Sequence, residues 1–185
     1  MIRINKELLD YFNDLYVLQT FNFVEKESFS VGNFLIHQNK KGNDIFIIKT
    51  GITKCFVNEE NGRDFIQEFF GEGEILGEIE IFTETLSFSN VIALTDVTAY
   101  KIDKKNFYKL LDTNKDLNLI IIRALATKIR DTAIRTSQQQ VHPLDYNLKR
   151  LLRLISDQKI NFSKQDLADY LGITLRSLNR SLKKS

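Results

Sequence analysis

The 185-residue chain contains one cysteine, one proline, two histidines and no tryptophan. The single thiol, Cys55, excludes an intramolecular disulfide and any site that needs several thiolates, such as an iron–sulfur cluster. Because Cys55 lies in a strand-like run, we expect it to be buried and unreactive. His37 and His142 lack metal-ligand spacing, so no metal site is expected. No nucleophile, base and orienting group can be assembled from these residues, which argues against an enzyme.

Long apolar runs are also missing. No run reaches the roughly 18 residues that a membrane helix needs. The first residues, MIRINKELLDYF, are charged and amphipathic, and they lack the apolar block of a signal peptide. We therefore expect a cytoplasmic protein with no membrane partner.

Positive charge is missing from one stretch and concentrated in another. No lysine or arginine occurs between Gly71 and Thr98, where five glutamates lie. From Lys149 onward, nine basic residues face three acidic ones, a net charge of +6, whereas the preceding residues carry 17 basic and 21 acidic residues, a net charge of −4. A basic end on a mildly acidic body suggests that this end binds a polyanion, although a solvated lysine-rich end is the alternative.

Short β-branched and aromatic runs follow one another from about Phe21 to Ile102. Gly, Asn and Lys separate them, and Gly51 and Gly62 supply hairpin turns. Many short strands with little helix between them favour antiparallel sheets that form a sandwich or barrel. The expected strands lie within residues 33–38, 44–51, 53–58, 64–70, 89–94 and 97–103.

Helical spacing predicts a first helix over residues 8–16, a small helix over 103–113 and a long helix over 115–140. The long segment has no proline or glycine and would span ~39 Å. It carries an apolar stripe and further apolar residues beside it, so we expect it to pack both on its own barrel and on the same helix of a second subunit. A single core helix in a monomer is the alternative. The stripe consists of Ile122, Ala126, Ile129 and Ala133.

Pro143 interrupts the helical pattern and marks the best domain boundary, with Asp145 as the expected N-cap of the next helix. The expected division is a sensor domain (1–112), a dimerisation helix (113–141) and a C-terminal domain (142–185). Overall this is an α+β architecture.

The last residues have the pattern of two helices joined by a tight turn. Ser163 and Thr174 can cap the two helices, and Gly172 falls where the turn needs a positive φ. Apolar residues of both helices then face inward. The side chains left outward suit the major groove of DNA, because Arg and Asn contact guanine and adenine edges. An inert helical hairpin is the alternative. The expected DNA-binding residues are Thr174, Leu175, Arg176, Ser177, Asn179, Arg180 and Lys183.

Four landmarks in order resemble the CRP/FNR family of bacterial transcription regulators. FLIHQNKKGNDIFIIKTGITKCFV is similar to the family's early barrel strands, GEILGEIEIF to its nucleotide cassette, the 115–140 helix to its dimer helix, and KQDLADYLGITLRSLNR to its helix-turn-helix. The resemblance covers nearly the whole chain. It implies a homodimer with N-terminal cyclic-nucleotide-binding-like jelly-roll barrels and winged-helix heads that bind a roughly palindromic DNA duplex. RNA polymerase is a further candidate partner.

Three features depart from the family pattern in the C-terminal domain. Arg176 stands where the family often has glutamate, so we expect a different base preference. Ser181 replaces a branched apolar residue, and we expect it to loosen the second helix. The sequence stops at Ser185, before the usual wing, which leaves two alternatives: an unusually short protein or a fragment.

The sensor segment has the outline of a nucleotide cassette without its phosphate contact. Gly77 and Glu78 match the family's ribose-side pair, but Phe88 lies near the place of the phosphate-binding arginine. Because the surrounding segment is acidic, we expect no cAMP binding; the effector is unknown, or there is none. His37, the lone candidate haem ligand, is expected to be structural, the acid pair Glu78 and Glu80 is expected to be solvated, and no cofactor is expected. If the cavity is used, its expected residues are Gly77, Glu78, Ile79, Phe88 and Ser89.

The sequence thus predicts a sequence-specific transcription regulator of the CRP/FNR type that does not depend on cAMP. The alternative is a ligand-binding or protein-interaction module with the same barrel and dimer helix but without useful DNA binding.

Overall fold

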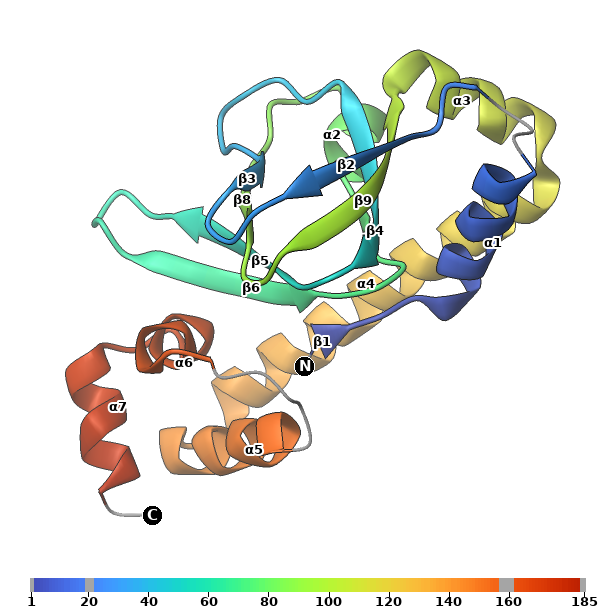
Figure 1. The fold of residues 1–185 in the computed structure, drawn as a ribbon. Helices are drawn as coiled ribbons and strands as arrows, with labels where there is room; N and C mark the ends of the chain where they lie inside the picture. The colour runs from blue at the N-terminus through green and yellow to red at the C-terminus, as the bar shows by residue number, and fades with distance from the viewer. Residues whose placement is uncertain (1, 19–21, 157–161, 184–185) are drawn as a thin grey trace.

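The computed structural model describes residues 2–18, 22–156 and 162–183. Two β-sheets form its N-terminal part, and a long helix leads from them to a small helical head (Figure 1). Three charged residues of the basic end, Asp157, Lys159 and Lys184, lie outside the described residues.

The two sheets confirm the expected antiparallel architecture, with one parallel pair, β1 on β6. The five-stranded sheet has the order β1 (Ile2–Arg3), β6 (Asp64–Phe70), β5 (Thr53–Asn58), β8 (Asn90–Ala93) and β3 (Phe34–Ile36). The four-stranded sheet has the order β2 (Glu25–Phe29), β9 (Val97–Asp103), β4 (Asp44–Thr50) and β7 (Ile75–Leu76). Six of these strands fall within the predicted segments.

The inner faces of the sheets supply one apolar core between them. Ile48, Cys55, Val91 and Ala99 belong to it, and all four are buried. Strand alternation explains the pattern, since every second residue of β5 and β9 points inward.

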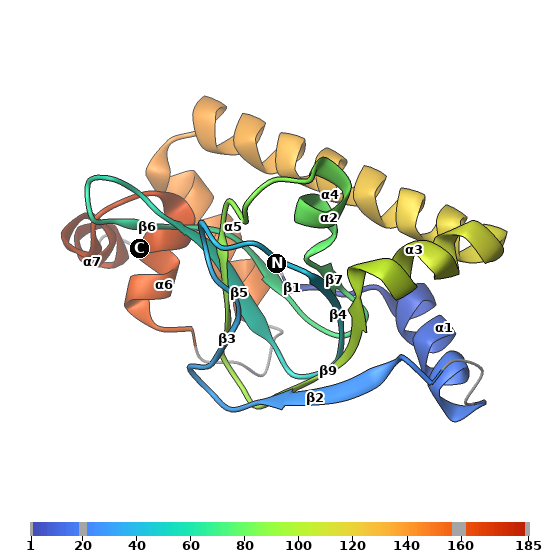
Figure 2. The same cartoon turned by 90° about the horizontal axis from the view of Figure 1, so that it is seen from above.

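A second core lies between the four-stranded sheet and three helices: α1 (Lys6–Val17), α3 (Lys104–Thr113) and α4 (Lys115–Val141). Phe12, Phe107 and Leu117 are fully buried there. Seen from above, α4 runs along one side of the molecule, with the short helix α2 (Glu78–Thr83) close to it (Figure 2). The long predicted helix is therefore present, and only its first half is covered by the chain's own core.

The C-terminal head packs α5 (Leu144–Ser156), α6 (Lys164–Leu171) and α7 (Leu175–Leu182) around a small core of their own. Both predicted caps are present: the Ser163 hydroxyl accepts from the Asp166 amide, and the Thr174 hydroxyl accepts from the Ser177 amide. Gly172 has a φ of 68° at the turn between them. The head therefore has the predicted two-helix turn.

One prediction for the head is wrong in detail. Asp145 is not the N-cap of α5, because the helix begins at Leu144 and the carbonyl of Pro143 accepts the first helical hydrogen bonds. Proline suits this entry, since it has no amide hydrogen to leave unpaired. α7 continues through Ser181 to Leu182 with Ser181 buried, and the loosening expected from this serine stays a prediction.

Gly73 lets the N-terminal segment lie against the barrel. Its φ is 77°, and an added Cβ would lie 1.8 Å from the carbonyl oxygen of Asn5. The Asn5 side chain in turn caps α1 by accepting from the Leu8 amide. A side chain at Gly73 would therefore displace the start of α1.

We expect Gly73→Ala to lower the free energy of unfolding by clearly more than the ~1–2 kcal/mol that positive φ alone costs an alanine. Gly62→Ala is the matched control, because Gly62 has a φ of 74° and its Cβ would meet nothing within 4 Å. Urea unfolding of both variants measures the difference. Equal losses would show that the contact with Asn5 is unimportant.

Candidate functional site

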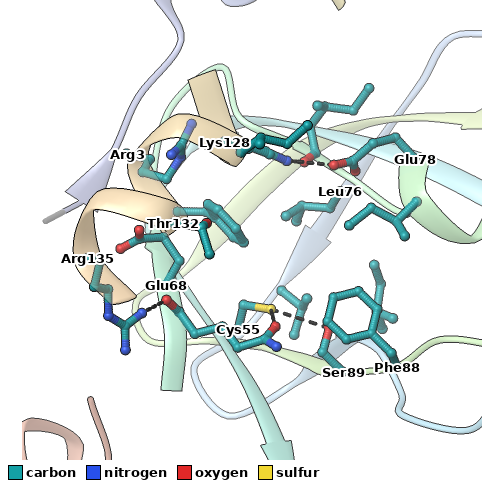
Figure 3. Close-up of a pocket in the computed structure, with 18 of the residues that line it drawn as sticks. Arg3, Cys55, Glu68, Leu76, Glu78, Phe88, Ser89, Lys128, Thr132 and Arg135 are labelled. Carbon is teal, nitrogen blue, oxygen red and sulfur yellow. Dashed lines mark hydrogen bonds and ion pairs between the residues drawn. The ribbon is translucent and has the colours of Figure 1, made fainter. Parts of the chain in front are cut away.

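A cavity of about 580 Å³ lies between the barrel, α2 and the second half of α4. Much of its wall is apolar, with Phe70, Leu76, Phe88 and Val91 among the lining side chains (Figure 3). All five effector-pocket residues predicted from the sequence, Gly77, Glu78, Ile79, Phe88 and Ser89, line it. Their use by an effector stays a prediction.

Gly77 shapes the entrance to α2. It has a φ of 87°, and an added Cβ would lie 2.5 Å from the carbonyl oxygen of Asp44. Glycine is required there both for the left-handed backbone and for the close approach of β4. The segment turns directly from β7 into α2 and so points Glu78 toward α4.

Glu78 is 2% exposed and is paired with Lys128 of α4 (Figure 3). The Lys128 ammonium lies 2.7 Å from the Glu78 carboxylate, donates to the Ile75 carbonyl at 2.6 Å, and lies 3.7 Å from Glu74. Burial raises the pKa of Glu74 even though Lys128 and Arg3 lower it. Lys128 therefore holds two buried carboxylates and fastens α4 to the barrel.

The expectation that Glu78 and Glu80 form a solvated pair is wrong. Both are buried, because they lie on the inner side of α2 rather than on an exposed strand. Glu80 accepts a hydrogen bond of 2.8 Å from the Ser87 hydroxyl. Each carboxylate thus has its own partner inside the protein, as buried polar groups require.

The acidic segment does not make the cavity as a whole acidic, because three cations line the wall together with three glutamates. Arg3, Lys128 and Arg135 line it, and all three come from outside the segment between Gly71 and Thr98. Arg3 lies 3.2 Å from Asp131 and 3.7 Å from Glu74. The acidic run between Gly71 and Thr98 did not indicate these cations, because they come from β1 and α4, which are distant in sequence.

Arg135 differs from Arg3 and Lys128 because it donates to three main-chain carbonyls, whereas those two cations lie against carboxylates. Its guanidinium donates to Ile66 at 2.6 Å, to Tyr170 at 2.9 Å and to Gln67. Nearby Glu68 also lines the cavity, and burial raises the pKa of its carboxyl. The sequence offered no signal for these residues, since their importance comes from the approach of α4 to β6.

Cys55 lines the cavity and is buried, as expected. Its thiol lies 3.3 Å from the Ser89 hydroxyl, and burial raises its pKa to about 12. A thiol with this pKa is almost wholly protonated at neutral pH and is a poor nucleophile. His37 is exposed, stacks on Phe34 and is not among the residues that line the cavity.

Two exposed faces, one apolar on α4 and one basic on α7, agree with the sequence pattern. The α4 stripe of Ile122, Ala126, Ile129 and Ala133 is exposed, with Ile122 59% and Ile129 72% accessible in the single chain. On α7, Leu178 is buried in the head, whereas Arg176, Arg180 and Lys183 are exposed. Ser177 and Asn179 are half-buried at the edges of that face.

We expect Lys128→Met to destabilise the fold by about 3–5 kcal/mol, because it leaves the buried Glu78 without its cation and leaves Glu74 with Arg3 alone. Lys104→Met is the control, since Lys104 pairs with the exposed Glu84 at 3.3 Å and such surface pairs contribute about 0–1 kcal/mol. Urea unfolding at neutral pH compares the two. A loss below about 1 kcal/mol for Lys128→Met would contradict the role given to this pair.

Comparison with known proteins connects this geometry to a family. The cyclic nucleotide-binding domain family matches residues 26–114. The cAMP-activated global transcriptional regulator CRP of Salmonella typhimurium is 22% identical over 160 residues, covering 80% of this chain and 76% of that protein.

Two solved structures share the fold over most of both chains. The c-di-GMP-responsive global regulator CLP of Xanthomonas campestris has a TM-score of 0.79 at 18% identity, covering 91% of this chain and 89% of that one. A regulator described as belonging to the CRP/FNR family of Eubacterium rectale has a TM-score of 0.78 at 15% identity, covering 97% and 87%. Within the described residues, no helix is long and apolar enough to cross a membrane. The domain match, these relatives and the two-sheet fold with its long helix and two-helix turn thus show a chain that contains a match to the cyclic nucleotide-binding domain and shares the fold of CRP/FNR-type transcription regulators.

Proposed function

We propose that the protein is a homodimeric transcription regulator that reads duplex DNA with α7. The observation that carries this proposal is a basic stripe on the outer face of that helix. Arg176, Arg180 and Lys183 stand at i, i+4 and i+7 and are all exposed, while Leu178 anchors the opposite face. A stripe at this spacing faces one direction and suits a groove lined by phosphates and base edges.

The exposed stripe of α4 supports the homodimer. Ile122 and Ile129 lie seven residues apart and present apolar surface that the single chain leaves open. The same helix of a second copy would cover it in coiled-coil fashion. Two copies of α7 related by a two-fold axis would then favour a roughly palindromic duplex.

We also propose that the cavity does not bind cAMP. A phosphodiester needs a cation with free donors. Lys128 and Arg3 are already paired with carboxylates, and Arg135 donates to main-chain carbonyls. Glu78, whose carboxylate the family resemblance assigns to the ribose, is held by Lys128 instead.

Selection from a random duplex pool, followed by gel shifts, tests the DNA proposal. We expect Arg176→Ala and Arg180→Ala each to weaken binding to the selected duplex, since one base contact contributes about 1–3 kcal/mol. Arg153→Ala is the control, because Arg153 is exposed on the neighbouring α5. Undiminished sequence-specific binding in both α7 variants would refute the assignment of this helix.

Two further measurements accompany the gel shifts. Sedimentation of the wild-type protein is expected to give a dimer, and a monomer would refute the role given to α4.

Binding to random duplex DNA is expected to fall steeply with salt, because phosphate contacts release counterions. A flat salt response would favour a ligand-binding or protein-interaction module over a DNA-binding protein.

Isothermal titration with cAMP tests the cavity proposal separately. We expect no binding heat and no change in melting temperature at millimolar cAMP, because Lys128 and Arg3 lie against carboxylates and Arg135 is held by main-chain carbonyls. Measuring Lys128→Gln in parallel shows whether release of Glu78 opens the site. Saturable binding of cAMP to the wild-type protein would overturn this proposal without affecting the DNA assignment.

A further inference from the structure

A second, smaller cleft lies between the N-terminal segment and α4. Its volume is about 230 Å³. β1 and the start of α1 form one wall, where they run beside α4 (Figure 1). Among the described residues that line this cleft, polar and charged side chains are in the majority: Arg3, Asn5, Glu7, Glu74, Arg123, Thr127 and Asp131. The cleft therefore differs in chemistry from the larger cavity, much of whose wall is apolar.

One residue of the cleft wall, Glu74, has a carboxylate oxygen without a hydrogen bond. Glu74 is 3% exposed, and its Oε2 atom accepts no hydrogen bond from the residues that the structure describes. The Lys128 ammonium lies 3.7 Å from this oxygen, beyond ordinary hydrogen-bond length. Burial raises the pKa of the Glu74 carboxyl, although Lys128 and Arg3 lower it. A donor placed in the cleft would therefore stabilise this buried oxygen.

Arg3 has the complementary unpaired group in the same cleft. Its Nε atom is buried and donates to no acceptor within the described part of the chain, although it lies 3.7 Å from the other oxygen of Glu74. The Nη1 atom of Arg3 is already used, since it donates to Asp131 at 3.2 Å. An N–H group without an acceptor and a carboxylate oxygen without a donor therefore lie close together in one cleft.

The size and charge of the cleft restrict what can occupy it. Its volume falls below the roughly 300–1,000 Å³ typical of sites for drug-sized ligands, so it suits a molecule smaller than a nucleotide. Two arginines and three carboxylates line it, which gives a formal charge of −1. A small anion would supply no donor to Glu74, and a small cation would supply no acceptor to Arg3.

The N-terminal wall is fixed by the protein itself. The Gly71 amide donates to the Arg3 carbonyl at 2.8 Å, and the Asn5 amide donates to the Glu72 carbonyl at 2.9 Å. The Asn5 side chain also caps α1. A wall that is already ordered reduces the entropy that binding would otherwise have to overcome.

The other wall belongs to a face of α4 that is separate from its exposed apolar stripe. Arg123, Thr127 and Asp131 stand four residues apart, about a third of a turn round the helix from the stripe that begins at Ile122. A second copy packed on that stripe would leave the cleft open. The site is therefore independent of the proposed dimer and of DNA binding.

We propose that this cleft binds a small zwitterion of the amino-acid type. The ammonium group of the ligand would donate to Glu74 Oε2, and its carboxylate would accept from Arg3 Nε. One molecule then pairs both buried groups, and its zero net charge leaves the formal charge of the site unchanged. Water also donates and accepts, so it is the competing occupant that the experiment has to exclude.

Thermal-shift and calorimetric titrations with the standard free L-amino acids at millimolar concentration test the proposal. We expect at least one of them to bind saturably and to raise the melting temperature. Its decarboxylated amine and its deaminated acid, which each lack one charged group, are expected not to bind. Absence of binding by every amino acid would assign the cleft to water and overturn the proposal. Equal binding of the amine or the acid would overturn the zwitterion class.

Glu74→Gln tests the buried carboxylate with little change of shape. We expect it to weaken binding of the selected amino acid about tenfold or more, because a hydrogen bond to a charged group is stronger than one to a neutral group. Glu27→Gln is the matched control, since Glu27 pairs with Lys101 on the barrel and does not line the cleft. Unchanged affinity in Glu74→Gln would overturn the proposal.

Thr127→Leu and Thr132→Leu locate the binding and decide the question if Glu74→Gln misfolds. Both residues lie on α4, but Thr127 lines the cleft, whereas Thr132 lines the larger cavity. We expect the bulk added at Thr127 to weaken binding about tenfold or more, and Thr132→Leu to bind as wild type does. Unchanged affinity in Thr127→Leu, or an equal loss in Thr132→Leu, would place the ligand elsewhere and overturn the proposal.

Discussion

The pairing of Lys128 with Glu78 and Glu74 is the interaction on which the arrangement of this molecule depends. One ammonium group on α4 neutralises two carboxylates that are 2–3% exposed, and it also donates to the end of β7. Burying carboxylates without a cation is too costly to persist. The long helix must therefore lie across the mouth of the barrel at this register, with Ile129 and Ala133 beside the cavity and Arg135 about two turns beyond Lys128, opposite β6.

Because α4 is anchored at Lys128, one helix serves three parts of the protein. Its first half is buried on the four-stranded sheet, as Leu117 and Ile121 show. Its stripe of Ile122, Ala126, Ile129 and Ala133 is exposed in the single chain. Its last turns reach Tyr170 of the head through Arg135 and Gln139. A shift of α4 along its axis would therefore move its buried half, its exposed stripe and its hydrogen bonds to Tyr170 together.

Much of the fold follows from local patterns, and the contacts inside the site do not. Caps at Ser163 and Thr174, the turn at Gly172 and the strand alternation each involve residues close in sequence, where spacing predicts structure. The pairing of Lys128 with Glu78 spans 50 residues, and that of Lys54 with Asp166 spans 112. No periodicity relates such positions. The short strands β1 and β7 were also missed, because two residues that pair with a distant strand carry too little pattern to detect.

The segment that resembles a nucleotide cassette shows in the same way that a local resemblance does not establish which contacts its residues make. Gly77 is required by the approach of Asp44 and by its positive φ, whatever the cavity binds. Glu78 likewise has a structural role without a ligand, because it is the ion-pair partner of Lys128. Residues that resemble a ribose site are thus retained for structural reasons, and a polar ligand at that place would have to break a 2.7 Å ion pair to use them. A ligand that leaves this pair intact would instead contact Phe70, Leu76 and Phe88 on the apolar part of the wall.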